Sequence, residues 1–281
     1  MHIYLYFCRP MADDLNQKTD MPFFEHIEAL RWHLLRSLGV IAGLGILLFF
    51  YNDILFGKIL FGPRHQDFIT YKVICKLGQY LFHDNSACIQ VATQDLINTD
   101  LAGQFTMHMW VSFIGGVILG MPYVLWELWK FISPALKNTE TRPVKGFVFV
   151  STILFLMGVA FSYFMVFPLT WNFLAPYAVS GDVKNLISFD SYVSNLTTLT
   201  LAFGLVFEMP VVVYFLSRMG LLTPAFMRKY RRHAIVVILV LAAFITPTSD
   251  IPTMMAVFVP LYLLYEASIF VSAYVNKKHF A

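Results

Sequence analysis

Two carboxylates of this sequence lie inside long apolar segments, where a carboxyl group is costly. Glu208 belongs to the apolar run at about 192–217, and Glu266 belongs to the run at about 253–275. Each lies 10 or 11 residues from the next basic residue, Arg218 or Lys277, a helical distance of roughly 15 Å. An ionisable group at such a depth in a membrane is by default a functional group. The alternative is a neutral acid that hydrogen-bonds within a helix bundle and serves structure alone.

The residues around Glu208 share its face of the expected helix. Thr200, Gly204 and Glu208 follow one another at intervals of four residues, so they form one small and polar stripe. We predict that this stripe, with Glu208 protonated, faces a partner inside the membrane. Pro210 removes a backbone donor and predicts a kink near Val206.

The residue types and their spacing give little support for a metal site, a cofactor site, an enzyme active site or a nucleic-acid interface. The three cysteines, Cys8, Cys75 and Cys88, form no Cys-x-x-Cys or Cys/His metal spacing, so we expect no bound metal. The sequence has no Gly-rich phosphate loop, Gly-x-Ser-x-Gly elbow or His-Glu-x-x-His motif, so we expect neither a cofactor nor an enzyme. Its basic residues cluster at helix ends without an interleaved aromatic patch, which argues against a nucleic-acid partner.

The apolar runs predict the elements that carry these side chains. Apolar residues make up 58% of the chain and charged residues 13%, about half the charged share of a soluble domain. Runs long enough to approach a membrane span fall at about 34–51, 105–129, 147–168, 192–217, 233–246 and 253–275. We therefore predict an all-α polytopic membrane protein with six transmembrane helices in a single domain at 26–281, after a cytoplasmic tail at 1–25. The fifth run is short for a span.

The distribution of basic residues predicts the orientation. Fifteen of the 20 lysines and arginines fall on one side of the six-span arrangement. They are Arg9, Lys18, Arg31, Arg36, Lys130, Lys137, Arg142, Lys145, Arg218, Arg228, Lys229, Arg231, Arg232, Lys277 and Lys278. Because lysine and arginine are retained in the cytoplasm, both chain ends are predicted to lie there.

The segment at about 52–104 becomes a long external loop in this topology. Alternating stretches at 68–71 and 89–91 mix with helix-like pieces, so we expect an ordered cap on the outer face. Cys75 and Cys88 both lie in this loop, in an oxidising compartment, where they form either a disulfide or two free thiols. The first ten residues, MHIYLYFCRP, do not form a signal peptide, and translation from Met1 or from Met11 is compatible with the sequence.

Small and charged residues mark the ends and faces of the first two spans. Gly39-x-x-x-Gly43 and Gly116-x-x-x-Gly120 allow close helix packing, which we expect within the chain. Glu127 and Lys130 lie beside two tryptophans at the inner end of the second span, a pattern typical of an interfacial anchor. The segment 23–36 is an amphipathic helix that runs into the first span.

Five segments, in order along the chain, together resemble the TatC family, the multispanning core of the twin-arginine protein translocase. They are His26-Ile27-Glu28-Ala29-Leu30-Arg31, then Trp129 to Leu136 followed by Glu140 and Arg142, then Tyr163 to Pro168, then Phe203 to Pro210, and Thr246-Pro247 with Asp250. The resemblance covers about His26 to Tyr274. Ala29 departs from the family's Glu before Leu-Arg, and His33 replaces a basic residue.

The resemblance implies a function in the cytoplasmic (inner) membrane. Members of this family recognise twin-arginine signal peptides and recruit TatA- and TatB-type single-span proteins into homo- and hetero-oligomers. Folded cargo then crosses the membrane at the expense of the proton-motive force. The signal-binding residues that it implies are Glu28, Leu30, Arg31, Phe131, Pro134, Glu140 and Arg142.

Carboxylates suit this role because a guanidinium pairs best with a planar carboxylate fork. The main alternative is a proton-coupled small-molecule permease in which Glu208 and Glu266 relay protons. That reading explains the intramembrane carboxyls but not the Trp-x-Phe-Ile-x-Pro-x-Leu segment at 129–136. A membrane-embedded hydrolase has less support still, because no nucleophile–base pair is apparent.

Overall fold

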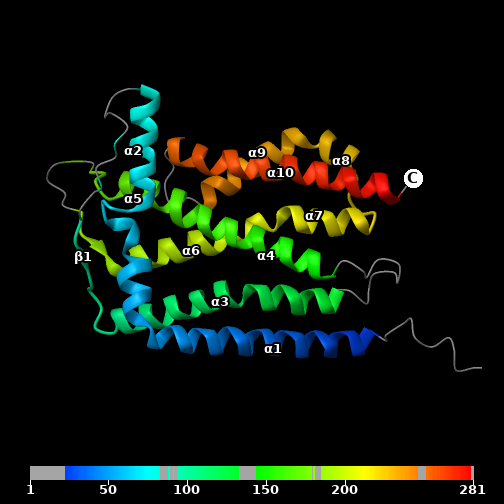
Figure 1. Ribbon diagram of the computed structural model, residues 1–281, viewed down its shortest axis with the longest axis horizontal. Helices are drawn as coiled ribbons and strands as arrows, with labels where there is room; N and C mark the ends of the chain where they lie inside the picture. Colours follow the sequence, from blue (N-terminus) through cyan, green and yellow to red (C-terminus); the bar gives the residue numbers. More distant parts are fainter. Residues whose placement is uncertain are drawn as a thin grey trace, which may run out of the picture.

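Long helices aligned along one axis dominate the computed structural model, which describes residues 23–82, 88, 91, 94–132, 144–178, 180, 185–245 and 251–279 (Figure 1). Within those residues five helical segments are long and apolar enough to cross a membrane: 28–50, 103–132, 146–174, 189–218 and 257–277. In a bilayer the backbone must satisfy its hydrogen bonds internally, and helices do so within one segment. The prediction of an all-α polytopic membrane protein is confirmed.

The first two long helices, α1 (Phe23–Phe50) and α3 (Gly103–Ile132), lie side by side and run antiparallel. Glycine makes this contact close: a Cβ on Gly116 would lie 2.6 Å from the Ile41 carbonyl oxygen, and one on Gly120 would lie 3.3 Å from Ile41 Cγ1. The facing residue on α1 is Gly45. The expected packing of the Gly116 motif within the chain is therefore confirmed, whereas no atom lies near the Cβ positions of Gly39 and Gly43.

The third and fourth spans are each interrupted. α4 (Val144–Phe161) continues through a π-helical turn, η6 (Ser162–Val166), into α5 (Phe167–Leu174). α6 (Phe189–Phe207) ends at Glu208, and α7 (Met209–Arg218) begins with Pro210 in its first turn. The backbone N–H of Glu208 bonds to the Leu205 carbonyl at 3.1 Å. The proline thus breaks the helix at residue 208, two residues beyond the predicted kink, because it ends the hydrogen-bond ladder and starts a new helix.

The last part of the chain is a short helix, α8 (Pro224–Lys229), followed by α9 (Arg231–Ile245) and α10 (Ile251–His279). α9 coincides with the fifth expected span but has 15 residues, about 22 Å of helix. It is shorter than the five segments named above, so the count of six full spans stays a prediction. Residues 246–250, which include Thr246, Pro247 and Asp250, lie outside the described residues.

One end of the bundle carries the segments that join the first two spans: η1 (Asp53–Leu60), η2 (Gly62–Arg64), α2 (Ile69–Phe82) and β1 (Leu96–Ile97). β1 pairs in parallel with β2 (Ile187–Ser188). The predicted alternating stretch at 68–71 is wrong, because α2 begins at Ile69 and crosses the bundle direction (Figure 1). A disulfide joins Cys75 on α2 to Cys88.

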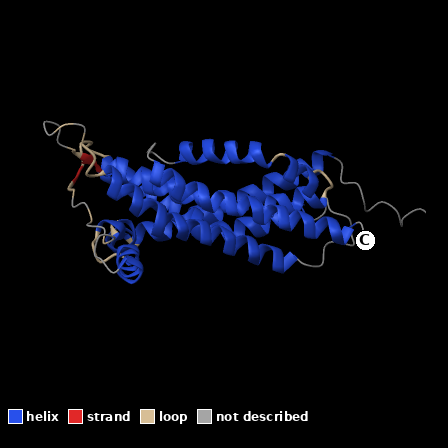
Figure 2. Ribbon diagram, turned by 90° about the horizontal axis from the view of Figure 1, so that it is seen from above, coloured by secondary structure: helices blue, strands red, loops and turns tan. Residues whose placement is uncertain are grey.

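Aromatic side chains fill the centre and fasten the outer segments to it. Tyr192, Phe155 and Phe203 are almost completely buried. Tyr192 donates to the Leu60 carbonyl at 2.8 Å, and Tyr163 donates to the Ile59 carbonyl at 2.6 Å. The molecule is elongated along its helices (Figure 2). We call the end at which α1 begins and α3, α7 and α10 finish (Figure 1) the basic end, because Lys130, Arg218 and Lys277 lie in the last turns of those three helices.

Candidate functional site

At the basic end, α1 and α3 are joined by a buried polar contact. His33 Nδ1 lies 2.5 Å from Glu127 Oε2, across 94 residues of sequence. The Glu127 side chain is 2% exposed and that of His33 is 20% exposed. Ser37, one turn deeper on α1, is buried and donates to the His33 carbonyl at 2.9 Å. A polar contact of this kind in an apolar setting fixes the facing of the two helices.

The other oxygen of Glu127 is bound by a lysine. Lys130 Nζ lies 3.4 Å from Oε1, and the same ammonium lies 3.8 Å from the centroid of the Trp126 ring. Glu127 was expected to be an interfacial anchor, and the structure instead buries it in the helix contact. The spacing from Gly116 and Gly120 to Glu127 could have shown this, since residues at intervals of four and seven share one helix face.

Some of the predicted signal-binding residues lie near this contact between α1 and α3, and the others lie outside the residues that the structure describes. Phe131 closes the α3 side, with its ring centroid 6.2 Å from that of His33. Leu30 is half-buried, one turn before His33 on the same face of α1. Arg31 is exposed. Pro134, Glu140 and Arg142 lie outside the described residues.

Glu28 lies on a different face of α1. It is exposed, and its position five residues before His33 places it about 140° around the helix from that residue at 100° per residue. The structure therefore does not bring Glu28 into the α1–α3 contact. Ala29 and Leu30 occupy that face instead.

The stripe around Glu208 is turned into the bundle. Ser151 Oγ on α4 donates to Glu208 Oε2 at 2.5 Å, and Glu208 is 8% exposed. A Cβ on Gly204 would lie 2.7 Å from the Phe155 ring, also on α4. Thr200 is buried and donates to the Leu196 carbonyl of its own helix. The surface expected to face a partner is thus covered by α4, because the small residues allow that helix to approach.

Glu266 also differs from its expected setting. Its Oε2 lies 2.5 Å from Nη2 of Arg231, the first residue of α9, and the Tyr262 hydroxyl donates to Oε1 at 2.9 Å. Glu266 is therefore paired with a basic residue of another helix, a partner that the sequence did not predict. The reason is that α8 and the start of α9 reach along α10, where the Tyr265 hydroxyl donates to the Met227 carbonyl at 2.8 Å.

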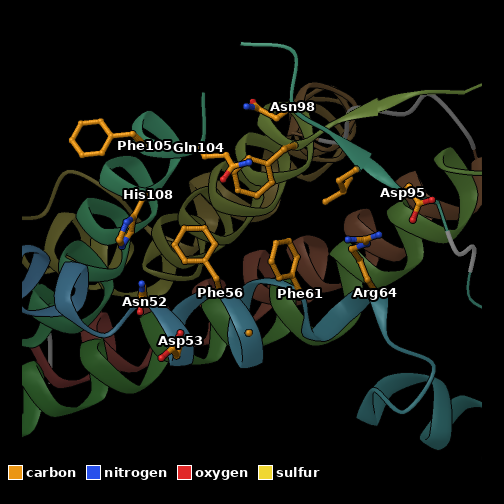
Figure 3. A pocket seen from close by; sticks show the side chains of 13 residues that line it. Asn52, Asp53, Phe56, Phe61, Arg64, Asp95, Asn98, Gln104, Phe105 and His108 are labelled. Carbon is orange, nitrogen blue, oxygen red and sulfur yellow. The ribbon is translucent and has the colours of Figure 1, made fainter. Parts of the chain in front are cut away.

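The opposite end of the molecule holds a cavity of about 840 Å³ with a mixed lining. Arg64 and Asp95 lie toward one end of it and Asn52 and Asp53 toward the other, with Phe56 between them (Figure 3). Arg64 is held by a bond from Nη2 to the Gln94 carbonyl at 2.5 Å. This cavity lies at the start of α3, far from the Glu127 contact. Among the described residues no group of three or more His, Cys, Asp or Glu side chains is arranged to hold a metal ion.

Comparison with known proteins places these features in one family. Residues 25–260 match the family described as Sec-independent protein translocase protein (TatC). The chain belongs to the TatC family. A TatC protein of Blattabacterium sp. subsp. Periplaneta americana (strain BPLAN) is 39% identical over 265 residues, which cover 94% of this chain and 99% of that protein. One from Carboxydothermus hydrogenoformans is 31% identical over 262 residues, covering 93% and 96%.

Solved structures of this family have the same fold. A crystal structure described as the twin arginine translocase receptor TatC in DDM is 29% identical, with a TM-score of 0.69 over 88% of this chain and 99% of that one. A second structure of that receptor is 27% identical, with a TM-score of 0.64 over 89% and 99%. As a TatC protein, the chain is a component of a protein translocase, a transport family, and a multipass membrane protein.

Proposed function

We propose that this TatC protein is the receptor for twin-arginine signal peptides and the core of a translocase for folded proteins. One observation carries the proposal: two segments far apart in the sequence, the start of α1 and the end of α3, meet at the basic end through His33, Glu127 and Phe131. These are the segments in which the resemblance puts signal recognition. The solved relatives described as receptors support the same reading.

The proposed binding surface combines charge with apolar contact. Glu28 and Glu140 supply carboxylates for the two guanidinium groups, and these pairs are stronger than ordinary surface pairs because the membrane boundary is partly desolvated. Leu30, Phe131 and Pro134 offer apolar surface to the rest of the signal peptide, while Arg31 and Arg142 flank it. The chain leaves α3 at Ile132, beside Phe131, so the segment that carries Pro134, Glu140 and Arg142 starts at this junction.

The rest of the proposed mechanism follows from the membrane setting. The basic end faces the cytoplasm, the membrane is the inner membrane, and the proton-motive force drives transport with TatA- and TatB-type single-span partners. The permease alternative has less support, because Glu208 and Glu266 have separate partners, Ser151 and Arg231, on different helices. Membership of a protein translocase family also favours a protein substrate.

Signal-peptide crosslinking tests the proposal. Removal of one carboxylate from a charge-assisted pair costs on the order of 1.5–3 kcal/mol, so Glu140→Ala should reduce crosslinking of a twin-arginine peptide about ten-fold. Asp13→Ala, a carboxylate change in the tail, is the matched control and should leave crosslinking unchanged. Equal crosslinking in the two variants would remove Glu140 from the site, and absence of crosslinking to the natural chain would refute receptor function.

A further inference from the structure

The α1–α3 contact at the basic end contains one described carboxylate, and basic and aromatic side chains surround it. Among the side chains that the structure describes on the early part of α1 and the late part of α3, the carboxylates are Glu28 and Glu127. Glu28 points away from the contact, as its position on the helix shows. Glu127 is buried within the contact, with His33 on one oxygen and Lys130 on the other, and the Tyr123 hydroxyl also hydrogen-bonds to this carboxylate.

Both oxygens of Glu127 are in contact with a nitrogen atom, as both are when a guanidinium binds a carboxylate. His33 Nδ1 approaches Oε2 at 2.5 Å, and Lys130 Nζ approaches Oε1 at 3.4 Å. An arginine side chain offers two parallel N–H donors in one plane, which bind both oxygens of one carboxylate at once. One guanidinium can therefore replace the imidazole and the ammonium together and leave neither oxygen of Glu127 unpaired.

Lys130 and His33, the two side chains that bind the oxygens of Glu127, can both be displaced from it. The Lys130 side chain is 41% exposed, and its ammonium already lies against the Trp126 ring at 3.8 Å, so that ring holds the charge when the carboxylate is taken. The His33 side chain reaches solvent on one side and meets Phe131 edge-on. Phe131 also supplies an aromatic face on which a guanidinium stacks.

We infer that Glu127, rather than Glu28, accepts one arginine of the twin-arginine signal, and that His33 and Lys130 hold this carboxylate while the receptor is empty. The inference rests on the proposed receptor function and adds a residue to its binding site. It gives the site a reason to prefer arginine: a lysine ammonium is a single point charge and cannot replace both partners of a buried carboxylate. Leaving one oxygen of a buried carboxylate unsatisfied is costly.

The test compares two peptides on the full-length chain in lipid nanodiscs. A fluorescent signal peptide with the arginine pair and the same peptide with a lysine pair are titrated against the natural chain, Glu127→Gln and the control Asp100→Asn. Asp100 is an exposed carboxylate in the segment just before α3, at the far end of that helix. Glu127→Gln should weaken the arginine peptide about ten-fold and the lysine peptide far less, so that the preference for arginine collapses.

A purely structural role for Glu127 gives a different result. In that case Glu127→Gln would weaken the binding of both peptides by the same factor. That outcome, or unchanged binding of both peptides, overturns the inference. A second variant, His33→Ala, removes a competing partner and should strengthen binding of the arginine peptide, whereas weaker binding contradicts the exchange. If the natural chain binds neither peptide, the receptor function itself fails, which is a distinguishable result.

Discussion

Glu127 and Glu208 are carboxylates buried in an apolar bundle, and each is held by a side chain from another helix. Glu127 is bound by His33 and by Lys130, whereas Glu208 is bound by the Ser151 hydroxyl through one oxygen. The second oxygen of Glu208 is buried without a partner among the described residues. A cation can stabilise a charged carboxylate, but a hydroxyl alone matches a neutral one better. The two carboxylates are therefore suited to different tasks.

Substitution of Glu208 separates hydrogen bonding from titration. Glu208→Gln keeps an oxygen that accepts from Ser151, so export of a twin-arginine reporter should be largely retained. Glu208→Ala leaves the buried Ser151 hydroxyl without this partner, at a cost of about 1–3 kcal/mol, and should lose export while the protein still accumulates. Reporter export together with immunoblots of membranes measures both. If the glutamine variant is as inactive as the alanine variant, titration is required; normal export by both makes Glu208 structural.

At the scale of helices, the contact of α1 with α3 decides where the proposed binding surface lies. Gly116 and Gly120 bring the backbones together along the middle of the helices, and His33 with Glu127 fixes their basic ends. Without water to drive association inside a membrane, close van der Waals packing and a few polar contacts hold such helices together. A substitution in the middle of this contact should therefore alter the positions of α1 and α3 at the proposed signal-binding end.

A matched pair of glycine substitutions tests this contact. Gly116→Ala places a methyl group 2.6 Å from the Ile41 carbonyl oxygen, so the helices must shift; overpacking of this kind costs about 1–3 kcal/mol. Gly43→Ala meets no atom within 4 Å and gains helix propensity of up to about 1 kcal/mol. Thermal unfolding in detergent should show a lower midpoint for Gly116→Ala and an equal or higher one for Gly43→Ala. Equal midpoints for the two variants would contradict the close approach.

For the whole molecule, the two ends of the bundle differ in chemistry. The basic end gathers the arginines and lysines at the ends of α3, α7 and α10 together with the Glu127 contact. The opposite end carries α2, the disulfide and the mixed cavity of Figure 3. Basic residues beside the spans are retained in the cytoplasm, and disulfides persist in oxidising compartments. Both observations favour the same orientation.

Cysteine labelling at exposed lysines tests that orientation. In a Cys8→Ser background the two remaining natural cysteines are joined to each other, so a new cysteine gives the signal. A cysteine at Lys229 on α8 should react with an impermeant maleimide only after the cells are opened. A cysteine at Lys72 on α2 should react in intact cells. Labelling of Lys229→Cys in intact cells would overturn the predicted topology.

The length and spacing of the apolar runs were enough to predict the helices, because a bilayer permits a spanning segment few ways to satisfy its backbone. The same holds for the small-residue stripe of Gly116, which needs only helical periodicity, and for the break at Pro210, although its position moved by two residues. The outer segment was predicted less well. Residues 68–71 alternate in polarity as a strand would, but α2 begins at Ile69 because the residues that follow continue the helix. Thr70 joins α2 to η6 through a hydrogen bond to the Phe164 carbonyl.

Only the tertiary structure decided which carboxylate meets which partner. Glu127 and His33 are 94 residues apart, and Glu266 and Arg231 are 35 apart. Neither spacing lies within the helical neighbourhood of three or four residues that a sequence pattern reveals. The depth of Glu266 in the membrane was predicted from its distance to Lys277, the next basic residue along the chain. The basic residue that pairs with Glu266 is Arg231, which belongs to another helix. The sequence determines which segments form helices. The tertiary structure determines the partner of each buried carboxylate, because an electrostatic interaction depends on the distance between two groups and not on their order along the chain.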